Sequence, residues 1–276
     1  MMDSADRAAA RASGRNLSLG ILLMVVVGGV GSFLISRGRW WLPPGASAQA
    51  VEIDRLFYTT LAVTGIAFVL VHVVLALFVW QGGRTERAAY FPEHRTLELT
   101  YTLAPAAILI TLISMGAVVW ARVHQPAPAN ALVVEVRAEQ FGWLFRYPGA
   151  DGTFARVDPT LINSRTNPLG LDPADVAGRD DIVTRELHLV GNRPVHVRLR
   201  AKDVIHSFFV PAFRVKQDAV PGMTVDVVFT PTKDGTYEIA CAELCGVGHY
   251  IMRGKITVEP QQVFDTWLAS QAPAAR

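Results

Sequence analysis

Apolar side chains dominate three stretches near the N-terminus, Leu17–Ser36, Thr59–Trp80 and Leu97–Trp120. A helix of about 20 apolar residues crosses the roughly 30 Å hydrocarbon layer of a bilayer, so each stretch is long enough to span a membrane. The second and third stretches end in tryptophan, which favours the interface between lipid and water. The pattern predicts a transmembrane helical hairpin within residues 51–125.

The first apolar stretch supports two interpretations. It follows Arg7, Arg11 and Arg15, as in a signal peptide or an uncleaved signal anchor. The small residues of 46–50 offer cleavage motifs, although they lie well beyond the end of the apolar stretch. These motifs tip the balance towards cleavage, and residues 1–50 are predicted to be a signal peptide or an additional transmembrane segment.

Charge sets the orientation of the hairpin. Arg84, Arg87 and Arg95 lie in the loop between the second and third apolar stretches, and positively charged loops remain in the cytoplasm. Everything after Trp120 is then exported, whether or not the first stretch is removed. The sequence predicts a multi-pass protein of the inner (plasma) membrane with its C-terminal domain on the periplasmic, outer side.

The hydrophobic pattern changes after the proline-containing linker Gln125–Pro128. Short strand-like segments, separated by Pro, Gly and Asp, favour a β-sandwich or Greek-key barrel over residues 126–276. The residues of 158–181 are predicted to form a long surface loop, and those of 261–270 a closing helix. The predicted strands are 131–136, 186–189, 195–200, 224–230, 235–240 and 254–258.

Composition narrows the class of protein. The chain is 51% hydrophobic and only 18% charged, which is too apolar for an ordinary soluble protein. Its net charge of +2 comes from scattered basic residues, so a nucleic-acid partner is excluded. The chain also has no Cys-x-x-Cys-His motif for attached haem, which leaves haem chemistry to partner subunits.

The candidate chemistry lies in the segment from Cys241 to Met252. Cys241 and Cys245 are the two cysteines of the chain, and on their own they fit a redox pair, a metal motif or two free thiols. With His249 and Met252 they provide two thiolates, an imidazole and a thioether, a soft set that selects copper. A zinc site takes Cys, His or carboxylate ligands and would not include the methionine. A blue-copper site has a single cysteine ligand, whereas this segment has two.

Two bridging thiolates can hold a pair of copper ions that share one unpaired electron. Such a site needs a second imidazole, and His206 is well placed at the end of a predicted strand. A backbone carbonyl inside the cysteine loop can supply the remaining donor. Gly246 and Gly248 allow that loop to fold back tightly, because glycine adopts dihedral angles that other residues avoid.

These motifs resemble those of cytochrome c oxidase subunit II. The pattern Cys-x-Glu-x-Cys-Gly-x-x-His-x-x-Met is matched at every fixed position from Cys241 to Met252. The upstream Asp-Val-x-His-Ser is matched from Asp203 to Ser207, and the segment Lys216–Met223 follows as in the family. The resemblance extends from the second apolar stretch to the terminal helix, and it implies a cupredoxin-like domain on the transmembrane hairpin.

The resemblance also implies a ligand set. Cys241 and Cys245 would bridge the two copper ions of a dinuclear CuA centre. His206 and Met252 would complete one ion, whereas His249 and a main-chain carbonyl of the loop would complete the other.

That carbonyl belongs to Glu243, whose carboxylate would then be free to bind magnesium at the interface with the catalytic subunit. The alternative is an ordinary exposed loop carboxylate.

Two further segments are similar to the family. Glu98, seven residues before Pro105, occupies the place of an acid at the cytoplasmic mouth of a proton channel, and a carboxylate that stabilises a helix start is the alternative. In the aromatic segment Gln140–Tyr147, Phe141 stands where the family usually has the tryptophan that receives electrons from cytochrome c. Trp143 is a candidate substitute, and core packing is the alternative for the whole cluster.

The resemblance implies a subunit of a proton-translocating respiratory terminal oxidase. It would accept electrons from cytochrome c or a similar small donor and pass them to haem in catalytic subunit I, which reduces oxygen to water alongside further subunits. One rival is a quinol-oxidase subunit that has lost its copper, which the intact donor set opposes. Nitrous oxide reductase would need a large additional domain, and a non-catalytic copper-binding module would not need Glu98 or Glu243.

Overall fold

The computed structural model describes residues 4–85, 90 and 92–274, so Arg87 of the predicted cytoplasmic loop lies outside the described residues. The chain divides into two compact units. One comprises Met1–Leu42 with Arg55–Val118, and the other comprises Pro43–Asp54 with Val119–Arg276. The second unit therefore includes a short segment that precedes the second apolar stretch.

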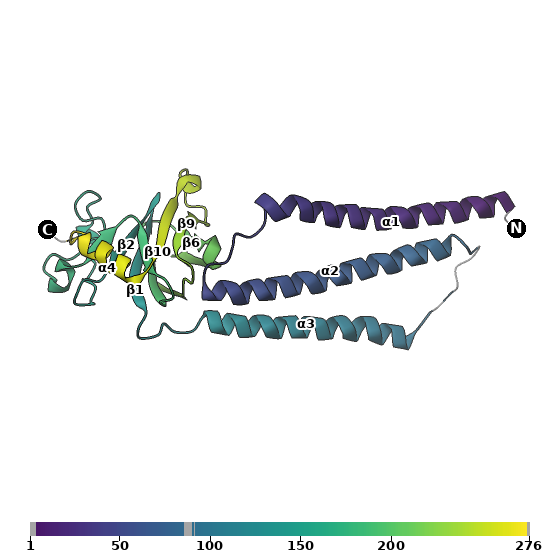
Figure 1. The fold of residues 1–276 in the computed structure, drawn as a ribbon, viewed down its shortest axis with the longest axis horizontal. Helices are drawn as coiled ribbons and strands as arrows, with labels where there is room; N and C mark the ends of the chain where they lie inside the picture. Colours follow the sequence, from purple (N-terminus) through teal and green to yellow (C-terminus); the bar gives the residue numbers. More distant parts are fainter. Residues whose placement is uncertain (1–3, 86–89, 91, 275–276) are drawn as a thin grey trace. The chain divides into compact units, whose positions relative to one another are not determined.

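The first unit is helical. It contains α1 (Ser4–Arg39) and most of α2 (Ala48–Gly82) and α3 (Arg95–Val123), and each helix is long and apolar enough to cross a membrane (Figure 1). Most of their large apolar side chains are exposed, as expected of surfaces that face lipid. The three predicted apolar spans are confirmed as helices.

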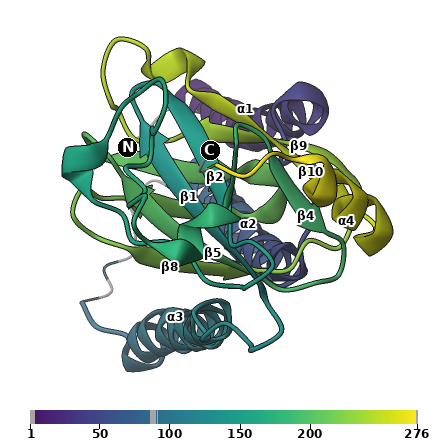
Figure 2. The same cartoon turned by 90° about the vertical axis from the view of Figure 1, so that its left-hand side faces the viewer.

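The second unit is a β-sandwich of two five-stranded sheets, with strand orders β3-β2-β1-β5-β8 and β4-β10-β9-β6-β7 (Figure 2). Neighbouring strands are antiparallel except for the parallel pairs β1–β5 and β4–β10. The predicted all-β domain is confirmed. The strands are β1 (Leu132–Glu139), β2 (Gly142–Tyr147), β3 (Ile182–Thr184), β4 (Leu187–Val190), β5 (Val195–Ala201), β6 (His206–Val210), β7 (Val215–Ala219), β8 (Val225–Phe229), β9 (Gly235–Cys241) and β10 (Arg253–Glu259).

The core of the sandwich follows from alternation along the strands. In β1, Val134, Val136 and Ala138 are fully buried between the sheets, because successive side chains of a strand point to opposite faces. The predicted terminal helix is confirmed as α4 (Gln261–Ser270), which lies beside β4. Its Trp267 stacks on His188 of β4, with ring centroids 3.8 Å apart.

The outer face of the first sheet is covered by the long loop predicted around 158–181. The loop has only short 3-10 turns, and its Leu169 and Leu171 pack on Leu144 of β2 in a small second core. Arg146 is buried beneath the loop, where its Nε donates to Asp181 Oδ2 at 3.1 Å.

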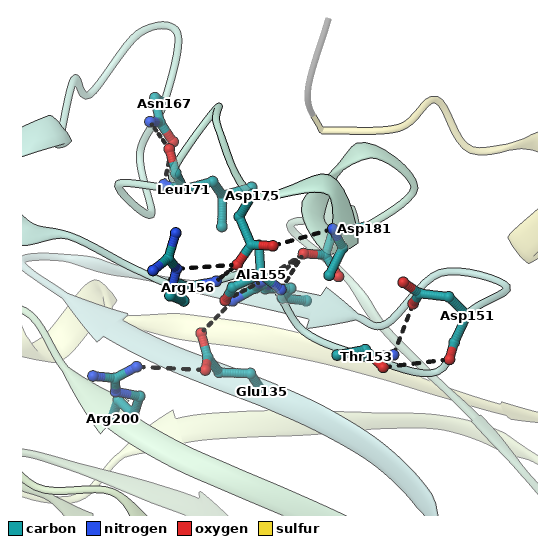
Figure 3. Close-up of polar contacts among 12 residues, drawn as sticks. Glu135, Asp151, Thr153, Ala155, Arg156, Asn167, Leu171, Asp175, Asp181 and Arg200 are labelled. Carbon is teal, nitrogen blue, oxygen red and sulfur yellow. Dashed lines mark hydrogen bonds and ion pairs between the residues drawn. The ribbon is translucent and has the colours of Figure 1, made fainter.

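Glu135 of β1 completes this buried charge cluster. Its Oε1 lies 3.5 Å from Arg146 Nη1. Its Oε2 lies 3.6 Å from Arg200 Nη1, and Figure 3 shows this pair. Removing one partner of such a buried pair leaves an uncompensated charge, which typically costs about 3–5 kcal/mol. The cluster therefore fixes the loop to the sheet.

The segment Pro43–Asp54 is built into the β unit by hydrogen bonds. Ala46 donates its N–H to the Ala212 carbonyl at 2.8 Å, and Ser47 Oγ donates to the Phe213 carbonyl at 2.7 Å. Asp54 accepts two hydrogen bonds from Arg214 at 2.7 and 2.9 Å. Ser47 also accepts the N–H of Ala50 at 3.0 Å, as a helix N-cap does, which is why α2 begins well before the apolar stretch.

Candidate metal centre

The candidate site lies where two neighbouring strands and a loop meet. His206 is the first residue of β6 and Cys241 is the last residue of β9, and these strands are paired through Phe208 and Cys241. After Cys241 the chain forms an eleven-residue loop, 242–252, which we call the cysteine loop. It then returns as β10, which pairs with the other edge of β9. The paired strands thus bring the upstream histidine to the cysteine loop.

The two sulfur atoms are close but not bonded to each other. Cys241 Sγ lies 3.8 Å from Cys245 Sγ, whereas a disulfide bond is about 2.05 Å long. A metal ion can contact both, because two metal–thiolate bonds of about 2.3 Å together exceed that separation. His206, Cys241 and Cys245 have ligand atoms within 4.8 Å of one another.

The other predicted donors surround this pair. His206 Nδ1 lies 4.0 Å from Cys241 Sγ, and His249 Nδ1 lies 3.6 Å from Cys245 Sγ. Met252 Sδ lies 3.7 Å from Cys245 Sγ. All of these distances are too long for covalent bonds and short enough for the atoms to share metal ions.

The sixth donor is a carbonyl. The main-chain oxygen of Glu243 lies 3.2 Å from Cys241 Sγ, while the residue itself is exposed. The two thiols, His206 and the buried Met252 exclude most solvent from the site, so a bound ion would sit in a medium of low dielectric constant. The structure therefore brings together all six donors that the sequence singled out.

The thiols must lose protons to bind metal. Burial, and then the neighbouring Cys241 thiol, raises the pKa of the Cys245 thiol to about 11 in the metal-free protein. Metal binding therefore releases protons at neutral pH and weakens as the pH falls.

Asp203 orients the histidine, a role that the sequence analysis did not assign. Its Oδ1 lies 2.8 Å from His206 Nε2, which leaves Nδ1 facing the sulfur atoms. Burial alone would raise the pKa of the Asp203 carboxyl, but hydrogen bonds from His206 and from the backbone N–H groups of Gln140 and Val204 hold it below its usual value. Its position three residues before a candidate ligand was the available signal.

Gln140 and Phe141 hold the cysteine loop from outside. Gln140 Nε2 donates to the Cys245 carbonyl at 2.6 Å, and the ring of Phe141 lies directly on Gly246 and Gly248. Gly246 has a φ of +127°, which an L side chain rarely adopts. The turn between β1 and β2 thus supports the loop that carries most of the donors.

Gly248→Ala should weaken metal retention. A Cβ there would lie 2.5 Å from Phe141 Cδ2, so the ring or the loop must move, and such overpacking typically costs about 1–3 kcal/mol. Copper remaining after dialysis against a chelator measures the effect. Gly142→Ala is the matched control, since a Cβ at Gly142 meets nothing within 4 Å. Equal copper retention in Gly248→Ala and the wild type would contradict this interpretation of the loop.

Trp143 is buried beside the site and not on the surface. It is 3% exposed, and its ring centroid lies 6.5 Å from that of His206 in an edge-on arrangement. Its Nε1 has no hydrogen-bond partner within the described part of the chain. Phe141, by contrast, is only half-buried. Any contact between Trp143 and a docked protein would therefore be indirect.

Glu98 belongs to the helical unit, in the first turn of α3. Its Oε1 accepts the backbone N–H of His94 at 3.2 Å, and the side chain is exposed. A carboxylate that caps a helix makes this contact, so the structure supports a role for Glu98 in stabilising the start of α3. The role in proton uptake stays a prediction.

The fold and the site define a membrane-anchored β-sandwich protein with a soft, sulfur-rich candidate metal site. The family description "Cytochrome C oxidase subunit II, transmembrane domain" matches residues 36–116, and "Cytochrome C oxidase subunit II, periplasmic domain" matches residues 132–259. The chain belongs to the cytochrome c oxidase subunit II family. It is a component of a terminal oxidase complex, anchored in the membrane with its β-sandwich in the periplasm.

Individual relatives match over most of the chain. The alternative cytochrome c oxidase subunit 2 of Bradyrhizobium diazoefficiens is 39% identical to this chain. The alignment covers 91% of this chain and 90% of that protein. Cytochrome c oxidase subunit 2 of Thermostichus vulcanus is 30% identical over 91% of this chain and 83% of its own length. The crystal structure of the periplasmic domain of subunit II of cytochrome oxidase of Bradyrhizobium japonicum is 29% identical, covers 52% of this chain and 96% of its own, and has a TM-score of 0.39.

Proposed function

We propose that this subunit accepts single electrons at a dinuclear copper centre and passes them to haem in the catalytic subunit I, where oxygen is reduced to water. The convergence of two thiols, two imidazoles, a thioether and a carbonyl carries the proposal. A copper-free quinol-oxidase subunit would have no need of this set. The electron donor is cytochrome c or a similar small redox protein.

The resemblance to the family, and not the distances, suggests how the donors would divide. Cys241 and Cys245 would be shared by two copper ions, His206 and Met252 would complete the donor set of one ion, and His249 with the Glu243 carbonyl would complete that of the other. When bound, such a thiolate-bridged pair takes up and releases one electron with little change in geometry, because the charge is spread over both ions. The protein contributes a rigid, buried cage and a fixed histidine orientation through Asp203.

The surroundings of the site suggest where electrons arrive. Phe141 is the half-buried aromatic residue on the cysteine loop, whereas Trp143 lies behind it against His206. Docking of a donor over Phe141, with Trp143 as an inner aromatic neighbour of the ligand, is consistent with both positions. The Glu243 carboxylate, exposed on the same loop, is the proposed magnesium ligand at the interface with subunit I.

A reductive titration of the copper-loaded subunit tests electron uptake. The wild type should take up one electron for every two copper ions, and two electrons per pair would contradict a shared-electron centre. Met252→Leu should keep both ions and the electron count but raise the reduction potential. The reason is that the weak thioether donor stabilises the oxidised form more than it holds the metal. An unchanged potential in Met252→Leu would remove methionine from the ligand set.

A further inference from the structure

The cytoplasmic end of the helical unit carries a basic cavity of about 800 Å³ that has no part in the electron transfer proposed above. It is lined by Arg7, Arg11 and Arg15 of α1, by Trp80 of α2 and by Arg84 in the turn after α2. The three arginines of α1 are four residues apart and share one helix face. Arg84 stacks on Trp80, with its guanidinium carbon 3.5 Å from the ring centroid.

Three of these four arginines have no counter-charge among the described residues. Within residues 4–85, 90 and 92–274, Arg11, Arg15 and Arg84 have no carboxylate partner, and no acidic residue lines the cavity. Like charges four residues apart destabilise a helix, so an external anion would be favoured here. Positive residues that only set the orientation of the helices must lie on the cytoplasmic side, but they need not face a common cavity.

An apolar groove of about 280 Å³ continues from the basic cavity. Arg15 and Trp80 line both, and the groove runs on between α1 and α2 along leucine, valine and alanine side chains. The helices meet closely nearby, because a Cβ at Gly14 would lie 3.0 Å from Gly83 Cα. A positive cavity joined to an apolar groove matches a ligand with an anionic head and a hydrocarbon tail.

We propose that α1 is retained in the mature protein and, with α2, binds an anionic phospholipid of the cytoplasmic leaflet. The phosphate lies among Arg11, Arg15 and Arg84, and an acyl chain follows the groove. A free phosphate ion would share the arginines but would leave the apolar groove without an occupant. The site exists only if α1 remains attached.

Retention of α1 has independent support at the small-residue cleavage motifs. Ala46 is 2% exposed and Ser47 is 1% exposed, and both are hydrogen-bonded within the β unit. Thr232 donates its N–H to the Ala46 carbonyl at 2.8 Å. Cleavage after Ala48 or Ala50 would remove these partners and leave buried polar groups unpaired.

Lipid selection by the purified full-length chain tests the proposal. The intact mass should first show that residues 1–46 are present, and a chain that begins beyond them would overturn the proposal. Native mass spectrometry with an equimolar mixture of phosphatidylglycerol and phosphatidylcholine of identical acyl chains should then show preferential retention of phosphatidylglycerol by the wild type.

Variants locate the site. Each arginine near an anionic headgroup contributes about fivefold in affinity, so Arg11→Gln with Arg15→Gln should weaken phosphatidylglycerol retention about 25-fold. Arg84→Gln, which leaves α1 untouched, should weaken it about fivefold. The control is Arg37→Gln with Arg55→Gln, which removes the same charge elsewhere and should behave as the wild type. Equal loss in the control, no loss in Arg84→Gln, or displacement of the lipid by millimolar inorganic phosphate would overturn the proposal.

Discussion

Replacing Cys245 by Ser should abolish the two-copper signature of the site. Cys245 Sγ is the central donor, at 3.8 Å from Cys241 Sγ, 3.6 Å from His249 Nδ1 and 3.7 Å from Met252 Sδ. A serine hydroxyl is a hard donor that does not bridge copper ions as a thiolate does. We therefore expect the purified variant to lose the shared-electron resonance spectrum entirely and to retain at most one copper ion.

The control for Cys245→Ser is Tyr250→Phe. Tyr250 is on the same loop, is 76% exposed, and should keep the native spectrum because it contributes no donor. Full retention of the native spectrum in Cys245→Ser would remove the bridging role from this residue and, with it, the proposed dinuclear assignment.

Glu98→Gln should lower turnover of the assembled oxidase by an order of magnitude or more. The change keeps the size of the side chain and a carbonyl acceptor for the His94 N–H, but it abolishes proton exchange. If the carboxylate only stabilises the start of α3, the same change should cost about 0.3–1 kcal/mol of local stability and leave turnover nearly intact. Steady-state oxygen consumption by the purified complex separates the two outcomes.

A matched variant makes this test specific. Glu93→Gln removes an equal charge just before the same helix, at an exposed position, and should leave turnover unchanged. Copper content should be normal in both variants, since the copper donors belong to the other unit. Wild-type rates in Glu98→Gln, or an equal fall in Glu93→Gln, would refute proton uptake through Glu98.

Much of the fold could be predicted because the spacing of apolar residues and the positions of Pro and Gly turns can be read from short segments of the sequence. The apolar stretches predicted the membrane helices, and alternating apolar positions with Pro and Gly turns predicted strands β1, β4, β5, β8, β9 and β10. Strand β6 was missed because His206 to Phe208 and Val210 are buried, which erases the alternation with period two. Strand β7 was missed because Val215–Ala219 is short and polar, and is ordered by pairing with β6.

The structure gives a packing role to residues that also fit a processing motif, and cleavage there stays a prediction. Ala46, Ser47 and Ala48 fit a cleavage pattern because they are small, but small residues also fit tight backbone contacts and helix caps. Only the folded β unit, with Ser47 bonded to Phe213, distinguishes a structural use of the segment. In the same way, burial of Arg146 depends on a loop that covers an outward-facing strand position.

The donor set could be predicted from the sequence because five of the six donors are close together in one loop. The contacts that hold the loop and its ligands in place could not be predicted from the sequence, because they depend on how β1 and β2 approach that loop. Asp203 bonds both His206 and the backbone of Gln140, and Gln140 bonds the Cys245 carbonyl. The three-residue spacing of Asp203 and His206 was a local signal for their contact, but no spacing along the chain indicates that Gln140 meets Asp203 or Cys245.

A copper count with an electron spin resonance spectrum decides whether the site holds a dinuclear copper centre. The whole chain should be used, because Pro43–Asp54 is part of the β unit that carries the donors. We expect two copper ions per chain and a seven-line hyperfine pattern, from one unpaired electron shared equally between two copper nuclei. One copper ion per chain with a four-line pattern would contradict it.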